Sequence, residues 1–488
     1  LSYVMESPHE KKVIWTGSDD GLVHISKDGG IHWQNVTPPG LKECLINAIE
    51  VSPHSPGTIY IATTRYKFND HTPALYKTSD YGKTWSNISK GIPDGAFTRV
   101  VREDQVRKDL LFAGTETGIY ISWNGGKEWS PFQLNLPITP ITDLKVHMGN
   151  LIAATSGRSF WILDDLGFIR QYQKDTSAFV LYQPDPVILA NGSSELDAPS
   201  PEFKGSHPTR GVNPATGAVF YYQLPDPKPG DVLLMEIKDE MGKPVRSFSS
   251  KKDSLFMKYD GGPPAEPVLP KAKGLNRFVW NLRHQTAPGI PGVYIESSYR
   301  GHKAIPGKYS VELKIGDRSL RTNVDIKTNV LYPTDAKTYF EYHSLMSEME
   351  KEVTDMHQMV NMIFNKRLQM EQIIASLTDE VKFKSIKDEG VLFVKSLKQW
   401  DEEMVQRKSK AYDDVENFPN KFTANYMFLI NQTESDIPRV NQSSLDRLKE
   451  LNEEWSVLQA RGNEFLNKNI PAFNRQLWDV GIGAIWKN

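Results

Sequence analysis

The sequence predicts a multidomain protein that is mainly β at first and then α. Three observations support this prediction. A phrase of the form Ser/Thr-x-Asp/Asn-x-Gly-x-x-Trp occurs three times near the N-terminus, at a period of roughly 50 residues that is typical of propeller blades. Short alternating strands with turn signals follow, as in a β-sandwich. A heptad pattern of apolar residues then begins and predicts packed helices.

We expect four regions along the chain. They are a partial β-propeller of about four blades over 1–175, a linker and long loop over 176–217, a β-sandwich over 218–330, and an antiparallel helical bundle over 331–488. Closed propellers typically use 4–8 blades, so we expect the blades to form an open arc. The first residues, LSYVMESPHE, indicate a strand that lies in the interior of a longer protein sequence. We therefore expect further blades of the same protein, and any signal peptide, to lie upstream.

Composition narrows the possible partners. The 488 residues carry 58 Lys+Arg and 60 Asp+Glu, and the net charge of −2 indicates neither a nucleic-acid nor a membrane-surface partner. The single cysteine, Cys44, excludes an intrachain disulfide and a cysteine-based zinc site. Since no apolar run reaches about 18 residues, we expect no membrane span.

Each copy of the repeated phrase is interpreted as a turn that its own side chains stabilise. The Asp or Asn side chain bonds amides of its own turn, the Gly permits positive φ, and the Trp packs as a wedge between blades. We therefore assign the repeated residues to structure and not to catalysis. They are Ser26, Asp28, Gly30 and Trp33, then Thr78, Asp80, Gly82 and Trp85, and finally Ser122, Asn124, Gly126 and Trp129.

These residues resemble the Asp-box, or bacterial-neuraminidase-type, repeat of sialidases, two-propeller xyloglucanases and the sortilin propeller. The longer phrases WTGSDDGLVHISKDGG and ATSGRSFWILDD resemble the C-terminal portion of bacterial sortilin-like proteins, which are often labelled glycosyl hydrolases. His32 and Glu128 stand where Thr is usual, and Ser156 stands where that family has His. The resemblance implies a bacterial protein that is secreted, periplasmic or on the outer cell surface.

The box turns close one rim of the propeller, so a site should lie on the opposite rim, where the second-to-third strand loops meet the links between blades. The candidate ligand-binding residues there are Asp19, Arg65, Tyr66, Asp70, His71 and Arg158. Together they would form a mixed-charge pocket with aromatic rings, suited to a glycan or a peptide. The alternative interpretation is a set of ordinary polar loop tips.

Two functions remain open. The leading hypothesis is a sortilin-like ligand-binding protein that is not catalytic in this portion and uses no cofactor or metal. The alternative is a glycoside hydrolase that uses rim carboxylates of the full propeller. Asp20 and Glu116 are the candidate catalytic pair. Such a pair must lie roughly 5–5.5 Å apart for retention of configuration or roughly 6.5–9.5 Å apart for inversion.

The sandwich region resembles the immunoglobulin-like domain of flagellar hook-capping and secretion-associated proteins, on the phrases GLNRFVWNLR and PGKYSVELKIGD. Trp280 and Tyr309 are predicted to be core residues. The Pro- and Gly-rich insert 284–306 is a candidate cover for the propeller rim. Its two isolated histidines, His284 and His302, give no metal motif.

The last region begins at Thr334, the predicted helix cap. Residues spaced by 4 and 3 then form the seam of one long helix: Tyr342, Met346, Met349, Val353, Met356, Val360 and Ile363. Further helices are predicted around 383–404, 420–433 and 448–465, with a break at Asp436-Ile437-Pro438. The methionines should pack in the core, or alternatively grip a partner helix. His343 and His357 lie two heptads apart and cannot share a metal on one helix.

Overall fold

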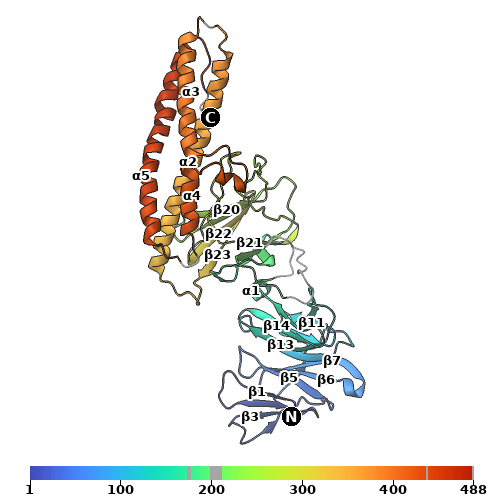
Figure 1. Cartoon of the computed structure of the whole chain (residues 1–488). Helices are drawn as coiled ribbons and strands as arrows, with labels where there is room; N and C mark the ends of the chain where they lie inside the picture. The colour runs from blue at the N-terminus through green and yellow to red at the C-terminus, as the bar shows by residue number, and fades with distance from the viewer. Residues whose placement is uncertain (173–176, 198–210, 380, 436–437, 486–488) are drawn as a thin grey trace. The chain divides into compact units, whose positions relative to one another are not determined.

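The computed structural model (Figure 1) describes residues 1–172, 177–197, 211–379, 381–435 and 438–485. The chain divides into two compact units, Leu1–Lys174 and Asp175–Asn488. The first unit consists mostly of small antiparallel sheets, and the second contains two further sheets and a helical region. The predicted order, mainly β and then α, is confirmed.

Four small antiparallel sheets follow one another along the first unit. The first contains β1 to β4 (Tyr3–Glu6, Ile14–Gly17, Val23–Ser26, Gln34–Asn35), and the second contains β5 to β8 (Leu45–Val51, Ile59–Arg65, Asp70–Thr78, Ser86–Asn87). The third contains β9 to β12 (Thr98–Glu103, Leu111–Thr115, Ile119–Ser122, Ser130–Pro131), and the fourth contains β13 to β15 (Ile141–His147, Asn150–Thr155, Phe160–Leu163). Each strand pairs with the next in the chain, which is the pattern of a propeller blade.

The first strands of successive sheets pack against one another. β1 contacts β5, β5 contacts β9, and β9 contacts β13. Buried residues of these strands, such as Ile46, Val101 and Leu144, form two apolar clusters that join neighbouring sheets. The fourth sheet has three strands and no box turn, in keeping with the absence of the repeated phrase from its sequence.

Two sheets share one core in the second unit. One has the order β16–β18–β21 (Val180–Leu181, Ala218–Leu224, Gly274–Trp280). The other has the order β17–β23–β22–β19–β20 (Val187–Ile188, Arg318–Lys327, Gly307–Ile315, Leu233–Lys238, Pro244–Ser249). Trp280 and Tyr309 are buried in this core and meet edge to face, with ring centroids 5.7 Å apart. The short strands β16 and β17 lie in the region for which the sequence predicts a linker and long loop.

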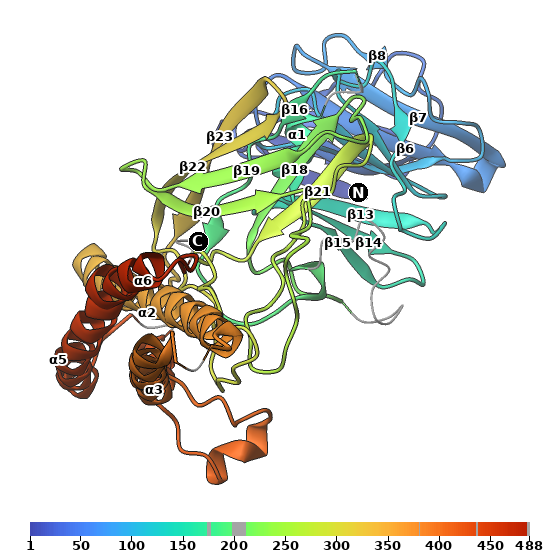
Figure 2. The ribbon, with the colours of Figure 1, turned by 90° about the horizontal axis from the view of Figure 1, so that it is seen from above.

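The helical region contains α2 to α6 (Ala336–Ser376, Lys384–Met404, Phe422–Thr433, Gln442–Glu464 and Ile470–Asp479). Figure 2 shows α2, α3, α5 and α6 grouped together. All seven residues of the predicted seam on α2 are buried, as expected for one long packed helix. The remaining helical turns are α1 (Leu166–Gln171) and the short segments Tyr66–Phe68, Glu195–Asp197, Tyr412–Glu416 and Phe465–Asn469.

Three details of this region differ from the expectations. Asp335, and not Thr334, caps α2, because its carboxylate accepts the N–H of Thr338 at 2.8 Å. The helix α6 follows α5 through a π turn that the apolar pattern did not indicate. The insert 284–306, predicted as a candidate cover for the propeller rim, places Ile290, Val293 and Tyr299 in the helical core. The predicted break at Asp436-Ile437-Pro438 lies partly outside the described residues. No helix among the described residues has the length and apolar composition that a membrane span requires.

Candidate functional site

The three box turns repeat one hydrogen-bond pattern. The Ser or Thr hydroxyl accepts the N–H of the box glycine at 2.8 Å in Gly30, 2.9 Å in Gly82 and 3.0 Å in Gly126. The Oδ1 atom of each Asp or Asn accepts an N–H four residues later, at 2.9–3.0 Å. The N–H of Thr84 is the main reason that the pKa of Asp80 falls to about 2. The box carboxylates are therefore ionised and occupied by their own turns.

The box tryptophans connect each sheet to the one before it. Trp85 Nε1 donates to the carbonyl oxygen of Val36 at 2.8 Å, and Trp129 Nε1 donates to that of Ile88 at 2.6 Å. Trp33 instead donates to Gly30 of its own box and is 45% exposed. The prediction of a wedge between sheets is thus right for Trp85 and Trp129. For Trp33 it stays a prediction, because the described residues include no sheet before the first one.

An aromatic cluster lies on the rim opposite the box turns. The ring of Tyr66 stacks on that of Phe97, with centroids 5.5 Å apart and planes 18° apart. The ring of His71, at the start of β7, has its centroid 5.6 Å from that of Phe97. Phe97 itself is buried, whereas Tyr66 is 41% exposed. The loops of the second and third sheets therefore meet around Phe97. The Phe97 cluster consists of Tyr66, His71 and Phe97 with their charged neighbours Arg65, Asp70, Arg99 and Glu116.

Two arginine–carboxylate pairs flank these rings. Arg65 Nε donates to Asp70 Oδ2 at 3.0 Å, and its Nη1 atom donates to the carbonyl oxygen of Glu43 at 3.0 Å. Arg99 donates to Glu116 Oε2 from both Nε and Nη2, at 2.8 and 2.6 Å, while its guanidinium lies over the ring of Phe97. The N–H of Thr72 and the pair with Arg65 lower the pKa of Asp70. Each carboxylate of the cluster thus has an arginine partner.

The structure brings together only part of the predicted set. Arg65, Tyr66, Asp70 and His71 gather with Glu116 in the Phe97 cluster. The remaining predicted residues lie in loops of the first and fourth sheets. They are Asp19, Asp20 and Arg158.

Asp19 is exposed, and the other two outlying residues bond within their own loops. The Ser18 hydroxyl donates to Asp20 and lowers the pKa of that carboxyl. The N–H of Arg158 bonds Thr155 in its own turn. Asp20 bonds Ser18 in the first sheet and Glu116 bonds Arg99 in the third, so each carboxylate of the candidate catalytic pair has its partner in its own sheet.

A buried arginine connects the innermost strands of all four sheets. Arg102 on β9 donates to Leu144 O at 2.8 Å, to the Tyr3 hydroxyl at 3.1 Å and to Asp143 Oδ1 at 2.8 Å, and it pairs with Glu50 at 3.5 Å. Burial raises the pKa of Glu50 to about 7 against the opposing charge of Arg102. Sequence reasoning missed this group, although charged residues at buried positions of apolar strands could have indicated it.

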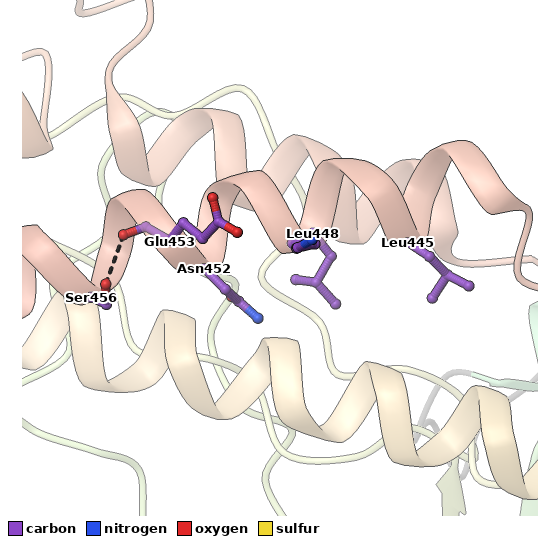
Figure 3. A pocket seen from close by; sticks show the side chains of 6 residues that line it. Leu445, Leu448, Asn452, Glu453 and Ser456 are labelled. Carbon is purple, nitrogen blue, oxygen red and sulfur yellow. Dashed lines mark hydrogen bonds between the residues drawn. The ribbon is translucent and has the colours of Figure 1, made fainter.

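A shallow groove also runs along α5 in the helical region (Figure 3). Its volume is about 490 Å³, and Leu445, Leu448, Asn452 and Ser456 line it. Leu448 is buried in the helical core, and Asn452 accepts the hydroxyl of Tyr426 at 2.8 Å. Leu448 and Asn452 therefore serve the packing of the helices, and none of the sequence-predicted site residues lines this groove.

No protein-family model matches the chain, and no curated protein matches it. Among solved structures it is similar to YCF48 from Cyanidioschyzon merolae, at 18% identity over 33% of this chain and 52% of that one, with a TM-score of 0.26. It is also similar to the GH74 xyloglucanase from Xanthomonas campestris, at 14% identity over 66% and 55% of the two chains, with a TM-score of 0.29. A GH74 enzyme from Niastella koreensis matches at 16% identity over 54% and 38%, with a TM-score of 0.28. The chain thus spans about half the length of the first two, and similarities this distant assign no function to it.

Proposed function

We propose that the Phe97 cluster binds a glycan or a peptide without catalysing a reaction on it. The observation that supports this most directly is the pairing of both carboxylates with arginine, Asp70 with Arg65 and Glu116 with Arg99. A glycosidase needs one protonated carboxyl to act as the acid at its working pH. The lowered pKa of Asp70 opposes that role, and two N–H donors already occupy Glu116 Oε2.

The exposed surface of the cluster favours a glycan over a peptide. Tyr66 and Phe68 are both more than one-third exposed on the loop after β6, beside the Arg65–Asp70 pair. Aromatic faces stack on the apolar faces of sugar rings, and paired ionic groups offer donors and acceptors to hydroxyl groups. Because each arginine of the cluster is matched by a carboxylate, the two pairs carry no net charge that would require a charged ligand.

Binding measurements distinguish a glycan ligand from a peptide ligand. The full-length protein would be titrated calorimetrically with a panel of neutral oligosaccharides and with short peptides. We expect saturable binding of an oligosaccharide, weakened at least about tenfold in Tyr66→Ala, because loss of an aromatic contact removes roughly 1–3 kcal/mol. Tyr412→Ala, at an exposed tyrosine of the second unit, is the matched control and should bind normally.

Other results point elsewhere. Saturable binding of peptides alone would identify a peptide receptor of the sortilin type. The alternative function, a glycoside hydrolase using rim carboxylates of the full propeller, predicts sugar products that disappear in Glu116→Gln or Asp20→Asn. Wild-type protein that binds neither class of ligand would refute the proposal.

The sheets of the first unit are proposed to form an open arc that upstream blades of the same protein complete. The environment of the box glycines supports this. A Cβ atom on Gly82 or Gly126 would lie 2.7 or 2.6 Å from Val36 or Ile88 of the preceding sheet, whereas one on Gly30 would meet only its own Trp33. The first box therefore has the contact surface of the later boxes without the sheet that they pack against.

The remaining regions complete the proposal. The two-sheet region is proposed to be an immunoglobulin-like sandwich and the helical region an antiparallel bundle, which serve as scaffold or docking elements. The resemblance to sortilin-like bacterial proteins supports a secreted, periplasmic or outer-surface location. Fractionation of the producing cells would test that location, because the full-length protein should be absent from the cytoplasm.

A further inference from the structure

Three histidines that lie far apart in the sequence meet in the second unit. His284 follows β21, His302 precedes β22, and His343 lies on α2. One ring nitrogen from each lies within 4.8 Å of the other two. His302 is fully buried, and the other two are half-buried. A sheet region and a helix thus supply the same small cluster.

Local backbone pairing holds His284 beside His302. The N–H of His284 donates to the carbonyl oxygen of His302 at 2.9 Å, and the two rings stack with centroids 4.1 Å apart. A Cβ atom at Gly301 would lie 2.6 Å from the carbonyl carbon of His284, so only glycine permits this approach. The two rings are therefore placed by the fold and not by chance contact of long side chains.

Glu350 orients the ring of His302. It lies two turns after His343 on α2, and its two carboxylate oxygens are each 3.0 Å from His302 Nδ1. Its Oε1 atom also accepts the backbone N–H of His302 at 2.6 Å. A carboxylate at Nδ1 keeps the proton on that atom and leaves Nε2 as a free acceptor. That Nε2 atom points into the cluster, 2.8 Å from His343 Nδ1.

One nitrogen of the cluster has no partner. His284 Nε2 is buried and makes no hydrogen bond with any of the described residues. A purely structural polar cluster normally satisfies its buried nitrogens, since an unpaired one costs roughly 1–3 kcal/mol. The orphaned nitrogen beside two convergent imidazoles therefore points to a ligand that accepts electron pairs.

We propose that His284, His302 and His343 bind one divalent transition metal ion, most favourably zinc, and that Glu350 positions His302 for it. Zinc–nitrogen bonds of about 2.0–2.1 Å in a tetrahedral site place ligand nitrogens roughly 3.3 Å apart. The present separations, from 2.8 Å to within 4.8 Å, lie on either side of that value, so small side-chain rotations suffice. The carboxylate–histidine contact is the usual outer support of such a ligand.

The donor set also selects the class of ion. Three imidazoles suit zinc and its neighbours in the transition series, whereas calcium and magnesium prefer oxygen ligands. Three protein ligands leave a fourth position for water or a bound molecule. Glu350 also places a carboxylate beside His302, where its negative charge would favour a bound cation.

Metal titration of the whole chain tests the site. Protein treated with a chelator and dialysed would be titrated with zinc by calorimetry, with metal analysis of the recovered protein. We expect one zinc ion per chain with a dissociation constant in the micromolar range or tighter. Cobalt in place of zinc should give the intense visible bands of a four-coordinate nitrogen site.

Variants separate this site from adventitious binding. His343→Ala should abolish stoichiometric zinc binding, and Glu350→Gln should weaken it roughly 10–100-fold. His147→Ala, at an exposed histidine of the first unit, should bind as the wild type does. Wild-type protein without stoichiometric zinc, or folded His343→Ala protein that binds as tightly, would overturn the proposal. If His343→Ala does not fold, unchanged zinc affinity in Glu350→Gln overturns it instead.

Discussion

Arg102 shows how much one side chain can contribute to a β-rich unit. Its guanidinium reaches Tyr3, Glu50 and Asp143, which lie on three strands other than its own. Because it is almost fully buried, its removal would leave a carboxylate and a carbonyl group without their donor.

We expect Arg102→Met to reduce the free energy of unfolding of the first unit by roughly 3–5 kcal/mol. Urea denaturation followed by circular dichroism would measure this loss. Arg158→Met, at an exposed arginine of the same unit, is the control and should change stability by less than about 0.5 kcal/mol. Equal effects of the two substitutions would show that the contacts of Arg102 contribute little.

Glu50 should make stability depend on pH. Its folded pKa of about 7 lies above the unfolded value of 4.5, because burial disfavours the charged form. The folded state therefore holds the proton more tightly. The resulting stability is fully present below about pH 4.5 and is lost as the pH rises through 7.

Glu50→Gln removes this titration while keeping the shape of the side chain. The variant should match the wild type near pH 4.5 and exceed it at pH 8 by roughly 2–3 kcal/mol, from about 1.4 kcal/mol per pKa unit. Thermal melts at both pH values would measure the difference. A variant that is less stable at pH 8 would show that the pair with Arg102 outweighs the cost of burying the charge.

At the scale of elements, the box tryptophans should differ in their contribution to stability. Trp129 is buried against the preceding sheet, and Trp33 is half-exposed. Trp129→Ala should therefore cost roughly 3–5 kcal/mol in this chain, and Trp33→Ala under about 1 kcal/mol. Denaturation of both variants measures the contrast. In a chain that includes a preceding blade, Trp33→Ala should become as costly as Trp129→Ala, and a persistent contrast there would show that such a blade does not pack on Trp33.

The elements with a strong periodic signal could be predicted from the sequence. Strands such as β2 and β14 alternate, and the α2 seam repeats at heptad spacing, so one more deeply buried face defines each of them. The two-residue strands β16 and β17 are too short to show a period. Their pairing with β18 and β23 depends on the tertiary structure and not on local sequence.

At the scale of the whole molecule, a site built from several elements is harder to predict from the sequence than a single element is. The sequence indicated Arg65, Tyr66 and Asp70 because one loop carries them all. It could not show that Arg99 would occupy Glu116, since a side-chain partner on a neighbouring strand has no local signal. The three histidines escaped for the same reason, because each is isolated in its own segment: backbone pairing joins His284 to His302, and the packing of α2 adds His343.

The four contacts of Arg102 have a consequence for how the first unit unfolds. In a simple repeat array each unit touches only its neighbours, so the ends fray independently and unfolding is gradual. The contacts of Arg102 instead couple β1 to β13 as well as to β5 and β9, which lie between them. The four sheets should therefore behave as one cooperative foldon, and Arg102→Met should broaden the urea transition as well as shift it.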